Sequence, residues 1–219
     1  LIIFLILIYF IGILINMKFL FDLGGIFFDW NPKHYYQSYF SSKDEMDFFL
    51  TSVCSDEWNV QQDRGRLIKD AEYELINKFP QYAKEIKMFY ANHRNMIKTT
   101  FQGSIELLLD LKSKNFLCYV LSNWSAETFV GMKDDYPFLN KFDGLLLSGE
   151  VKLIKPEIAI YELAISRFNL TPEETVFVDD KKENIEAAKK LNFITVHLTE
   201  PNKIKVELEK YMKKSSNFS

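Results

Sequence analysis

Residues 19–26 read Phe-Leu-Phe-Asp-Leu-Gly-Gly-Ile, and this stretch decides the fold of the chain. An apolar, strand-like run ends abruptly in Asp22, and two glycines follow at once. Open α/β sheets bind their ligands at the carboxyl ends of buried strands, where such an acid projects. The glycines allow the backbone to turn away and to approach a ligand closely. A turn residue or helix cap is the competing interpretation, which a second acidic strand end would disfavour.

That second strand end lies at residues 175–180, which read Thr-Val-Phe-Val-Asp-Asp. Two adjacent carboxylates repel each other unless a cation lies beside them, so Asp179 and Asp180 favour a metal site. Oxygen ligands with no histidine or cysteine nearby suit Mg²⁺ better than zinc. One of the two aspartates can instead cap the helix that follows.

Two further strand ends carry suitable chemistry. The apolar run at residues 116–121 leads to Ser122 and Asn123, whose hydroxyl and amide can hydrogen-bond an anionic oxygen. Lys155 stands before a proline that can open a helix, and its ammonium group can pair with a phosphate or with crowded carboxylates. Each residue alone is as well explained as a cap or surface charge, but their order at successive element boundaries predicts one site.

Short apolar runs alternate with amphipathic segments along most of the chain. This pattern predicts an α/β fold, a Rossmann-like parallel sheet core with helices on both faces and a helical cap inserted after the first strand. The expected elements after the insertion lie near residues 104–114, 116–121, 125–132, 143–148, 156–168, 174–178, 182–191 and 193–197.

The core is expected at residues 17–30 and 100–200, and the cap at residues 31–99. The insertion lacks a continuous apolar strand run, so it is predicted to be helical, with helices at 44–53, 66–79 and 82–98. Residues 201–219 form the expected C-terminal tail, with a short surface helix from 202 to 214 that frays into disorder.

Residues 1–16 are almost wholly apolar and are expected to lie outside the fold. As a helix, the run at 1–15 would span about 22 Å, short of the roughly 30 Å of a bilayer core. It also lacks the charged start and cleavage site of a signal peptide. The sequence favours Met17 as the true start, with the residues before it translated in error; a membrane anchor is the alternative.

Composition is typical of an ordinary intracellular enzyme, so a cytoplasmic location is expected. The chain of 219 residues is 47% hydrophobic and has a net charge of −3, which gives no electrostatic footprint for nucleic acid. Cys54 and Cys118 have no metal or redox spacing and are expected to be buried. A membrane is disfavoured as a partner, and the expected assembly is a monomer or homodimer.

With these motifs in place, the chain resembles the haloacid dehalogenase-like hydrolase superfamily, over roughly residues 17–200. Within it, the wording of residues 21–32 and of the inserted segment 62–65 is most similar to the sugar-phosphate phosphatases with a small helical cap. The matching motifs are Asp22-Leu23-Gly24-Gly25, Leu121-Ser122-Asn123, Lys155-Pro156, and Asp179-Asp180 with Asn184.

The resemblance implies a Mg²⁺-dependent phosphatase that works through an aspartyl-phosphate intermediate. It also implies that the partner is a small phosphorylated metabolite, with sugar phosphates as the first substrate class. Asp22 would be the nucleophile that attacks phosphorus. Its second oxygen, the Gly24 carbonyl, and one or both of Asp179 and Asp180 would hold Mg²⁺.

The resemblance also assigns the phosphate-binding residues. Ser122, Asn123 and Lys155 would bind the transferring phosphoryl group, and Lys155 would share in catalysis. Asn184 would steady the acidic cluster.

One departure from the family pattern concerns acid–base catalysis. Most phosphatases of the superfamily carry a second aspartate two residues after the nucleophile, and here that residue is Gly24. Such assistance is typically worth about 10²–10⁴-fold in rate. Asp29 or His34 could substitute, the leaving group could need little help, or turnover could be slow.

The same departure leaves two rival functions open. Haloacid dehalogenases also lack the second aspartate, but they use no metal and have no reason to crowd carboxylates beside the nucleophile. A degenerate, binding-only member would need a broken nucleophile or metal site, and neither is visible.

Trp30, just before the insertion, could pack against a substrate sugar ring or anchor the cap hinge. Within the insertion, Arg64 could reach the substrate or pair with Asp63 or Glu57 at the surface. Trp124 could border the same pocket or belong to the core.

Overall fold

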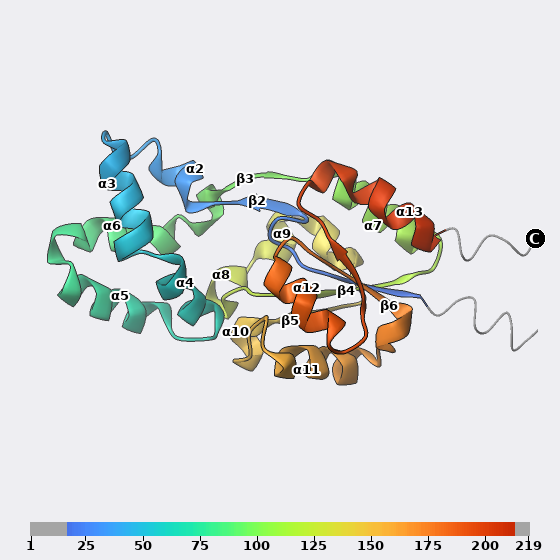
Figure 1. The fold of residues 1–219 in the computed structure, drawn as a ribbon. Coiled ribbons are helices and arrows are strands. Elements are labelled where there is room, and N and C mark those ends of the chain that lie inside the picture. Colours follow the sequence, from blue (N-terminus) through green and yellow to red (C-terminus); the bar gives the residue numbers. More distant parts are fainter. Residues whose placement is uncertain (1–16, 213–219) are drawn as a thin grey trace, which may run out of the picture.

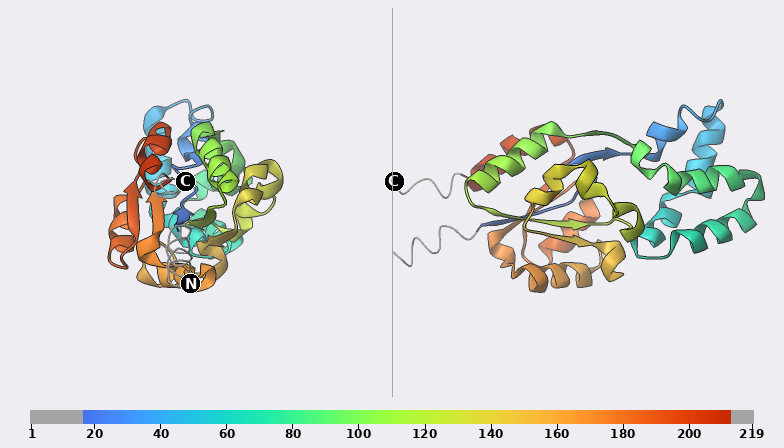
Figure 2. Two further views of the ribbon diagram at one scale, coloured as in Figure 1. Left: turned by 90° about the vertical axis from the view of Figure 1, so that its right-hand side faces the viewer. Right: turned by 180° about the vertical axis from the view of Figure 1, so that it is seen from behind.

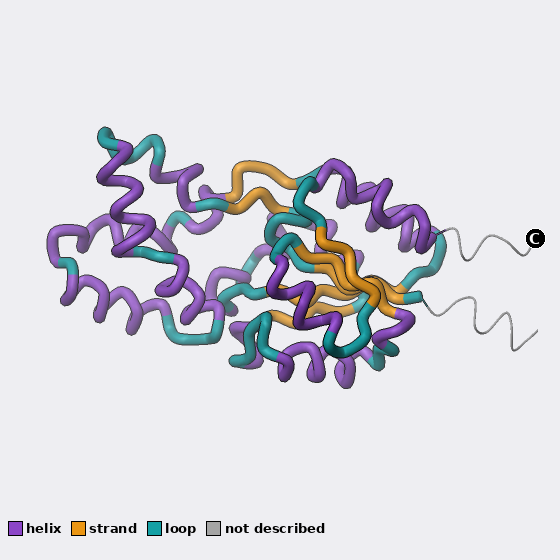
Figure 3. Tube along the Cα trace, in the orientation of Figure 1, coloured by secondary structure: helices purple, strands orange, loops and turns teal. Residues whose placement is uncertain are grey.

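The computed structural model describes residues 17–212, and its centre is a five-stranded parallel sheet (Figures 1 and 3). The strand order is β5-β4-β1-β6-β7. The chain runs outward from β1 to β4 and β5, then returns to the other side of β1 for β6 and β7. The predicted α/β parallel-sheet fold is confirmed. The strands are β1 (Lys18–Phe21), β4 (Leu117–Ser122), β5 (Gly144–Leu147), β6 (Thr175–Asp179) and β7 (Ile194–His197).

Alternation along β1 gives the sheet two apolar faces. Phe19 and Phe21 lie in one hydrophobic cluster, with helices α7 (Gln102–Ser113) and α13 (Ile204–Met212). Leu20 lies in the other, with helices α11 and α12. The views of the core show these two helix pairs on opposite sides of the sheet (Figures 1 and 2). Helix α11 spans Ile158–Phe168 and α12 spans Lys182–Lys189.

Strand register brings the predicted site residues to one edge of the sheet. Phe21 pairs with Val120 on β4 and with Val178 on β6. Asp22 therefore lies level with the residues that follow Val120 and Val178 on the two neighbouring strands. The Asp22 N–H continues the ladder by donating to the Val178 carbonyl at 2.9 Å. The carboxyl ends of β1, β4 and β6 therefore meet at one place.

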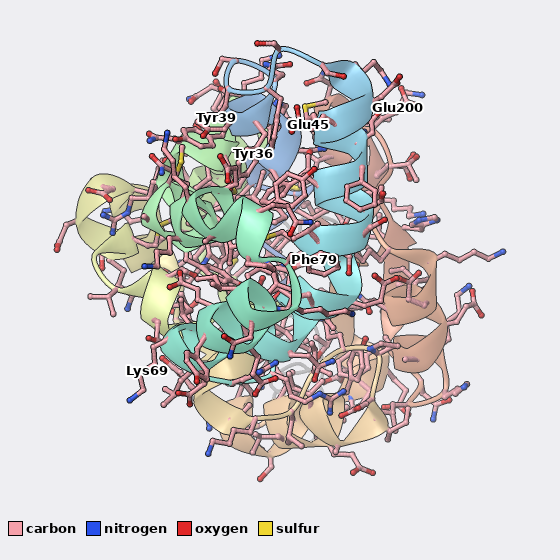
Figure 4. The ribbon with its side chains drawn as sticks, turned by 90° about the vertical axis from the view of Figure 1, so that its left-hand side faces the viewer. Tyr36, Tyr39, Glu45, Lys69, Phe79 and Glu200 are labelled. Carbon is pink, nitrogen blue, oxygen red and sulfur yellow. The ribbon has the colours of Figure 1, made fainter. Side chains whose placement is uncertain are left out.

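A second, antiparallel pair of strands connects the core to the cap (Figure 1). Strand β2 (Phe28–Trp30) leaves the core, and β3 (Ile97–Thr100) returns to it. The cap between them has its own hydrophobic cluster, which includes Tyr36 and Phe49. Figure 4 looks onto the cap from its outer end, with Tyr36 and Tyr39 in one region of it. The cap helices are α2 (Pro32–Tyr36), α3 (Lys43–Phe48), α4 (Asp56–Asp63), α5 (Ile68–Lys78) and α6 (Ala83–Ala91).

The remaining helical elements are short. Helices α8 (Ala126–Phe129), α9 (Met132–Asp135) and α10 (Ser148–Val151) lie in the core segment, and a π-helical turn at Phe49–Val53 extends α3. The 3₁₀ turns lie at Pro80–Tyr82, His93–Met96, Pro137–Lys141, Pro172–Glu174 and Pro201–Lys203.

The expectation that the insertion is wholly helical is wrong at its end. The helix expected over 82–98 stops at Ala91, and residues 97–100 form β3. Asn92 ends the helix with a non-helical backbone, and the following Ile-Lys-Thr-Thr segment is rich in β-branched side chains. Helices α2 and α4 were not expected, because each is short and weakly patterned.

Two core elements also differ from their expected form. The helix expected over 125–132 is divided into α8 and α9 at Gly131, whose φ of 78° is left-handed. Helix α13 does not lie loosely on the surface as the sequence analysis expected, because Ile204 and Leu208 are fully buried against the sheet-covering layer that includes α7.

None of the helices within residues 17–212 is long and apolar enough to cross a membrane. The expectations for residues 1–16 and for the end of the tail, 213–219, lie outside the described residues.

The packing of α13 predicts that Leu208→Ala lowers the free energy of unfolding by about 2–5 kcal/mol, as cavity-forming core substitutions do. The control on the same helix is Val206→Ala, since Val206 is 73% exposed and its truncation should change stability by no more than about 0.5 kcal/mol. Urea unfolding of both variants measures the difference. Equal stabilities for the two variants would contradict the buried position of Leu208.

Candidate active site

A tight turn directly after β1 holds Asp22 at the carboxyl edge of the sheet. The backbone N–H groups of Phe27 and Phe28 both donate to the Leu23 carbonyl, at 2.8 and 3.0 Å. The Leu23 N–H donates to Asp22 Oδ1 at 2.7 Å. These bonds fix the orientation of the Asp22 carboxylate. Asp22 is a buried residue, with only 6% of its surface exposed.

Lys155 lies between two carboxylates. Its Nζ atom is 2.9 Å from Asp22 Oδ2 and 2.6 Å from Asp179 Oδ2, and its side chain is fully buried. Burial lowers the pKa of Lys155, but the charges of Asp179 and Asp22 outweigh this and raise the pKa above its ordinary value. Lys155 is therefore a permanent positive charge at the centre of the site.

Asp179 is held from both sides. Its Oδ1 accepts the Lys181 N–H at 2.8 Å, and the Asn184 amide donates to both carboxylate oxygens at 3.0 Å. Asn184 lies in the first turn of α12 and reaches back toward the end of β6. The helix that follows β6 thus positions the carboxylate at that strand's end.

Three carboxylates gather where the sequence predicts a metal. Asp22, Asp179 and Asp180 each offer an oxygen atom, and these atoms lie within 4.8 Å of one another. Burial, together with the charges of Asp22 and Asp179, raises the pKa of Asp180 to about 6. A divalent cation would relieve this repulsion, and an all-oxygen donor set is the kind that Mg²⁺ prefers. The donor set therefore fits Mg²⁺.

Gly25 makes room for this cluster. Its φ is +68°, and a Cβ atom there would lie 2.5 Å from the Asp180 carboxyl group. Gly24, whose carbonyl is the predicted fourth ligand, lies in the same turn, and a Cβ atom at Gly24 would have no atom within 4 Å. The two glycines thus differ: the first leaves open space, and the second permits close approach.

The predicted phosphate-binding residues of the second motif have different surroundings. The Ser122 hydroxyl donates at 2.6 Å to Oδ1 of Asp22, the predicted nucleophile. The Asn123 side chain instead pairs with the backbone of Lys155, accepting its N–H at 2.9 Å and donating to its carbonyl at 3.0 Å. In this structure Asn123 positions Lys155 and has both side-chain groups engaged.

Arg64 does not lie beside the carboxylate cluster. Its guanidinium makes two hydrogen bonds to Glu157, at 2.6 and 3.1 Å, and both side chains are about two-fifths exposed. The ion pair expected with Asp63 or Glu57 is thus formed with a different acid, across the junction of cap and core. Arg64 links α4 to the start of α11.

Trp30 lies between core and cap, with its ring tilted against that of His93, which also contacts Trp124. The ring centroids are 5.5 and 5.7 Å apart in the two pairs. One ring nitrogen of each residue is buried and finds no hydrogen-bond partner within residues 17–212. Burial, aided by Arg94, lowers the pKa of His93 to about 4, so this imidazole is neutral at physiological pH.

The two residues considered as substitute acids pair with each other. His34 Nε2 lies 3.0 Å from Asp29 Oδ1, on the cap side of the connecting strands. A different carboxyl group, Asp63 at the end of α4, lies against the site's edge: its Oδ1 accepts the Ser125 N–H at 3.0 Å. The sequence analysis considered Asp63 only as a surface partner of Arg64.

The comparison with protein families agrees with this arrangement. The family model of the haloacid dehalogenase-like hydrolases matches residues 54–198, which is more than half of the chain. The chain belongs to this hydrolase family. The resemblance inferred from the four motifs is thereby confirmed at the level of the family, and the chain is a hydrolase.

Two curated relatives of the hydrolase are phosphatases. The sesquiterpene phosphatase astK of Aspergillus oryzae is 29% identical over 182 residues, which cover 83% of this chain and 89% of the relative. The glyceraldehyde 3-phosphate phosphatase of Methanocaldococcus jannaschii is 28% identical over 116 residues, which cover 50% of this chain and 48% of the relative.

Among solved structures, a HAD family enzyme of Bacteroides thetaiotaomicron in a magnesium complex has a TM-score of 0.67 and 21% sequence identity. The match covers 83% of this hydrolase and 92% of that chain. It shows that the two proteins share their fold.

We expect Gly25→Ala to weaken Mg²⁺ binding by at least about tenfold. The added methyl group would displace the Asp180 carboxylate, and the left-handed backbone would strain any residue with a Cβ atom by roughly 1 kcal/mol. Isothermal titration calorimetry with MgCl₂ measures the affinity. Gly103→Ala is the matched control, because a Cβ there meets nothing within 4 Å; equal affinities for the two variants would contradict the predicted role of Gly25.

The buried imidazole at the hinge predicts a pH dependence of stability. The pKa of His93 is lower in the folded than in the unfolded protein, so its contribution is present above pH 6.5 and is lost as the pH falls toward 4. The loss amounts to about 3 kcal/mol at most. His93→Phe keeps a ring beside Trp30 and Trp124 but does not titrate, so its unfolding free energy should fall less over this range. Urea unfolding at both ends of the range tests this, and parallel curves would contradict it.

Proposed function

We propose that this hydrolase is a Mg²⁺-dependent phosphatase that cleaves small phosphomonoesters through an aspartyl-phosphate intermediate on Asp22. The observation that carries the proposal is the clustering of Asp179 and Asp180 beside the nucleophile. A haloacid dehalogenase works without a metal and gains nothing from three crowded carboxylates. Two phosphatases among the curated relatives support the same function.

Each residue of the site has a chemical task under this proposal. Asp22 attacks phosphorus through one carboxylate oxygen. Lys155 and the Ser122 hydroxyl lie at the nucleophile and stabilise negative charge on the phosphoryl oxygens. Mg²⁺, when bound by Asp22, Asp179 and Asp180, would supply further positive charge at the same place.

The substrate class is the least constrained part of the proposal. Sugar phosphates are the first candidates, because the residues of segments 21–32 and 62–65 resemble those of the sugar-phosphate phosphatases. The A. oryzae relative is a phosphatase of sesquiterpenes, which adds terpenyl phosphates as a second class to be tested. A cytoplasmic location and a monomeric or homodimeric state stay predictions of the sequence.

The test is phosphate release from para-nitrophenyl phosphate and from a panel of glucose 6-phosphate, glycerol 3-phosphate and farnesyl phosphate. We expect release that requires Mg²⁺, stops with a chelator, and falls by at least about 1,000-fold in Asp22→Asn, which lacks the nucleophile. Asp70→Asn, on the exposed side of α5, is the control and should behave as the wild type. Release that persists in Asp22→Asn, or chloride release from 2-chloropropionate without metal, would contradict the proposal.

A further inference from the structure

The hydrolase lacks an acid where its family usually has one. The residue two positions after Asp22 is Gly24, and the alternatives Asp29 and His34 are paired with each other at 3.0 Å. When an alkyl phosphomonoester is cleaved, its leaving group departs as a strongly basic alkoxide unless an acid protonates it. Fast cleavage of such an ester therefore calls for an acid from elsewhere in the fold.

Asp63 is placed to meet this requirement. It is the last residue of α4, and it docks the cap onto the core through its side chain and its backbone: Oδ1 accepts the Ser125 N–H at 3.0 Å, and the backbone carbonyl accepts the Ser148 hydroxyl at 2.5 Å. Ser125 belongs to the segment that starts with Ser122, whose hydroxyl bonds Asp22 at 2.6 Å. One short segment after β4 thus contacts both carboxyl groups.

The electrostatic surroundings keep this carboxyl group in a useful protonation range. Burial and the charge of Asp22 raise the pKa of Asp63, the Ser125 N–H and Lys181 lower it, and the result is about 7. Tyr90 also faces Asp63, and burial, together with the charge of Asp63, raises the pKa of Tyr90. The Asn59 side-chain amide donates to Oδ2 of Asp63 at 3.4 Å. A general acid–base group works best when its pKa is near the working pH.

We propose that Asp63, supplied by the cap, is the general acid and base of the hydrolysis in place of an aspartate at position 24. This inference rests on the proposed phosphatase function. In the first step the bond between phosphorus and an Asp22 oxygen forms, the bond to the leaving oxygen breaks, and the Asp63 proton passes to that oxygen to give the alcohol. In the second step Asp63 takes a proton from the water that attacks phosphorus, and the bond to Asp22 breaks to release phosphate.

A cap-borne acid makes catalysis depend on docking. The carboxyl group of Asp63 is in position only while α4 rests on Ser125 and Ser148, so proton transfer is available when the cap covers the site. Gly65 allows this close contact, because its φ is +94° and a Cβ atom there would lie 2.8 Å from the Gly149 carbonyl.

The experiment compares kcat/KM on two leaving groups with Mg²⁺ present. Asp63→Asn keeps an oxygen that can accept the Ser125 N–H but cannot donate an acidic proton. We expect its kcat/KM to fall by at least about 100-fold on whichever of glycerol 3-phosphate and glucose 6-phosphate the wild type cleaves faster. On para-nitrophenyl phosphate, whose leaving group needs little protonation, the factor of loss should be at least about ten times smaller. The wild-type rate on the alkyl ester should fall above pH 7 as Asp63 loses its proton, and the variant should lack this fall.

Two further variants test the docking and the position of the carboxyl group. Ser148→Ala removes the bond to the Asp63 carbonyl and the bond from the Trp124 N–H. The carboxyl group is then less well positioned, so kcat/KM should fall more on the alkyl ester than on para-nitrophenyl phosphate, by a smaller factor than in Asp63→Asn. Gly24→Asp places a carboxyl group in open space. Added to Asp63→Asn, it should raise kcat/KM on the alkyl ester at least about tenfold above that of Asp63→Asn alone.

The proposal is overturned if Asp63→Asn, shown to be folded by its thermal unfolding, loses the same factor on both substrates. It is equally overturned if Asp29→Asn shows the selective loss instead, or if the wild type cleaves only the activated aryl ester. A wild type that releases no phosphate from any ester would instead refute the phosphatase function, and this inference with it.

Discussion

The site depends on one ammonium group shared by two carboxylates. Lys155 is fully buried, and its Nζ atom lies within 2.9 Å of both Asp22 and Asp179. A buried charge that loses its partner is strongly destabilising, typically by about 3–5 kcal/mol. The ends of β1 and β6 and the segment before α11 must therefore come together for any of these charges to be tolerated. The carboxylates of Asp22 and Asp179 and the ammonium of Lys155 carry a net charge of −1 together. The Asp180 carboxylate adds a further negative charge, so the folded site attracts a cation.

The sequence predicted the residues of this centre because they are ends of successive elements in a parallel sheet. Each apolar run is readable locally, and the parallel topology brings all carboxyl ends to one edge, so Asp22, Ser122, Lys155 and the aspartate pair could be placed together without coordinates. The role of each remains a prediction. The strand at residues 97–100 was missed for the opposite reason: its partner β2 lies far away in the sequence, and pairing between distant segments leaves no local periodicity.

Partners of polar side chains were the other feature that sequence could not supply. Asn123 was expected to face a phosphate, yet it holds the backbone of Lys155, 32 residues further along the chain. Arg64 was expected either to reach the substrate or to pair with an acid of the cap, yet it bonds Glu157 in the core. Both outcomes depend on how the insertion returns over the sheet, which is a property of the packed fold. Local spacing can suggest that such a residue is functional, but not which group it meets.

Neighbouring residues at the end of α4 show how the cap joins the core. Arg64 points to an exposed carboxylate on α11, where a surface ion pair contributes little stability. Asp63 points to the segment after β4, where burial destabilises its charged form. A carboxyl group with a raised pKa reduces stability as the pH rises from its unfolded value toward 7, because the unfolded chain releases that proton more readily. Stability alone would therefore favour an amide at this position, and the proposed proton transfer by Asp63 gives a chemical reason for an acid there.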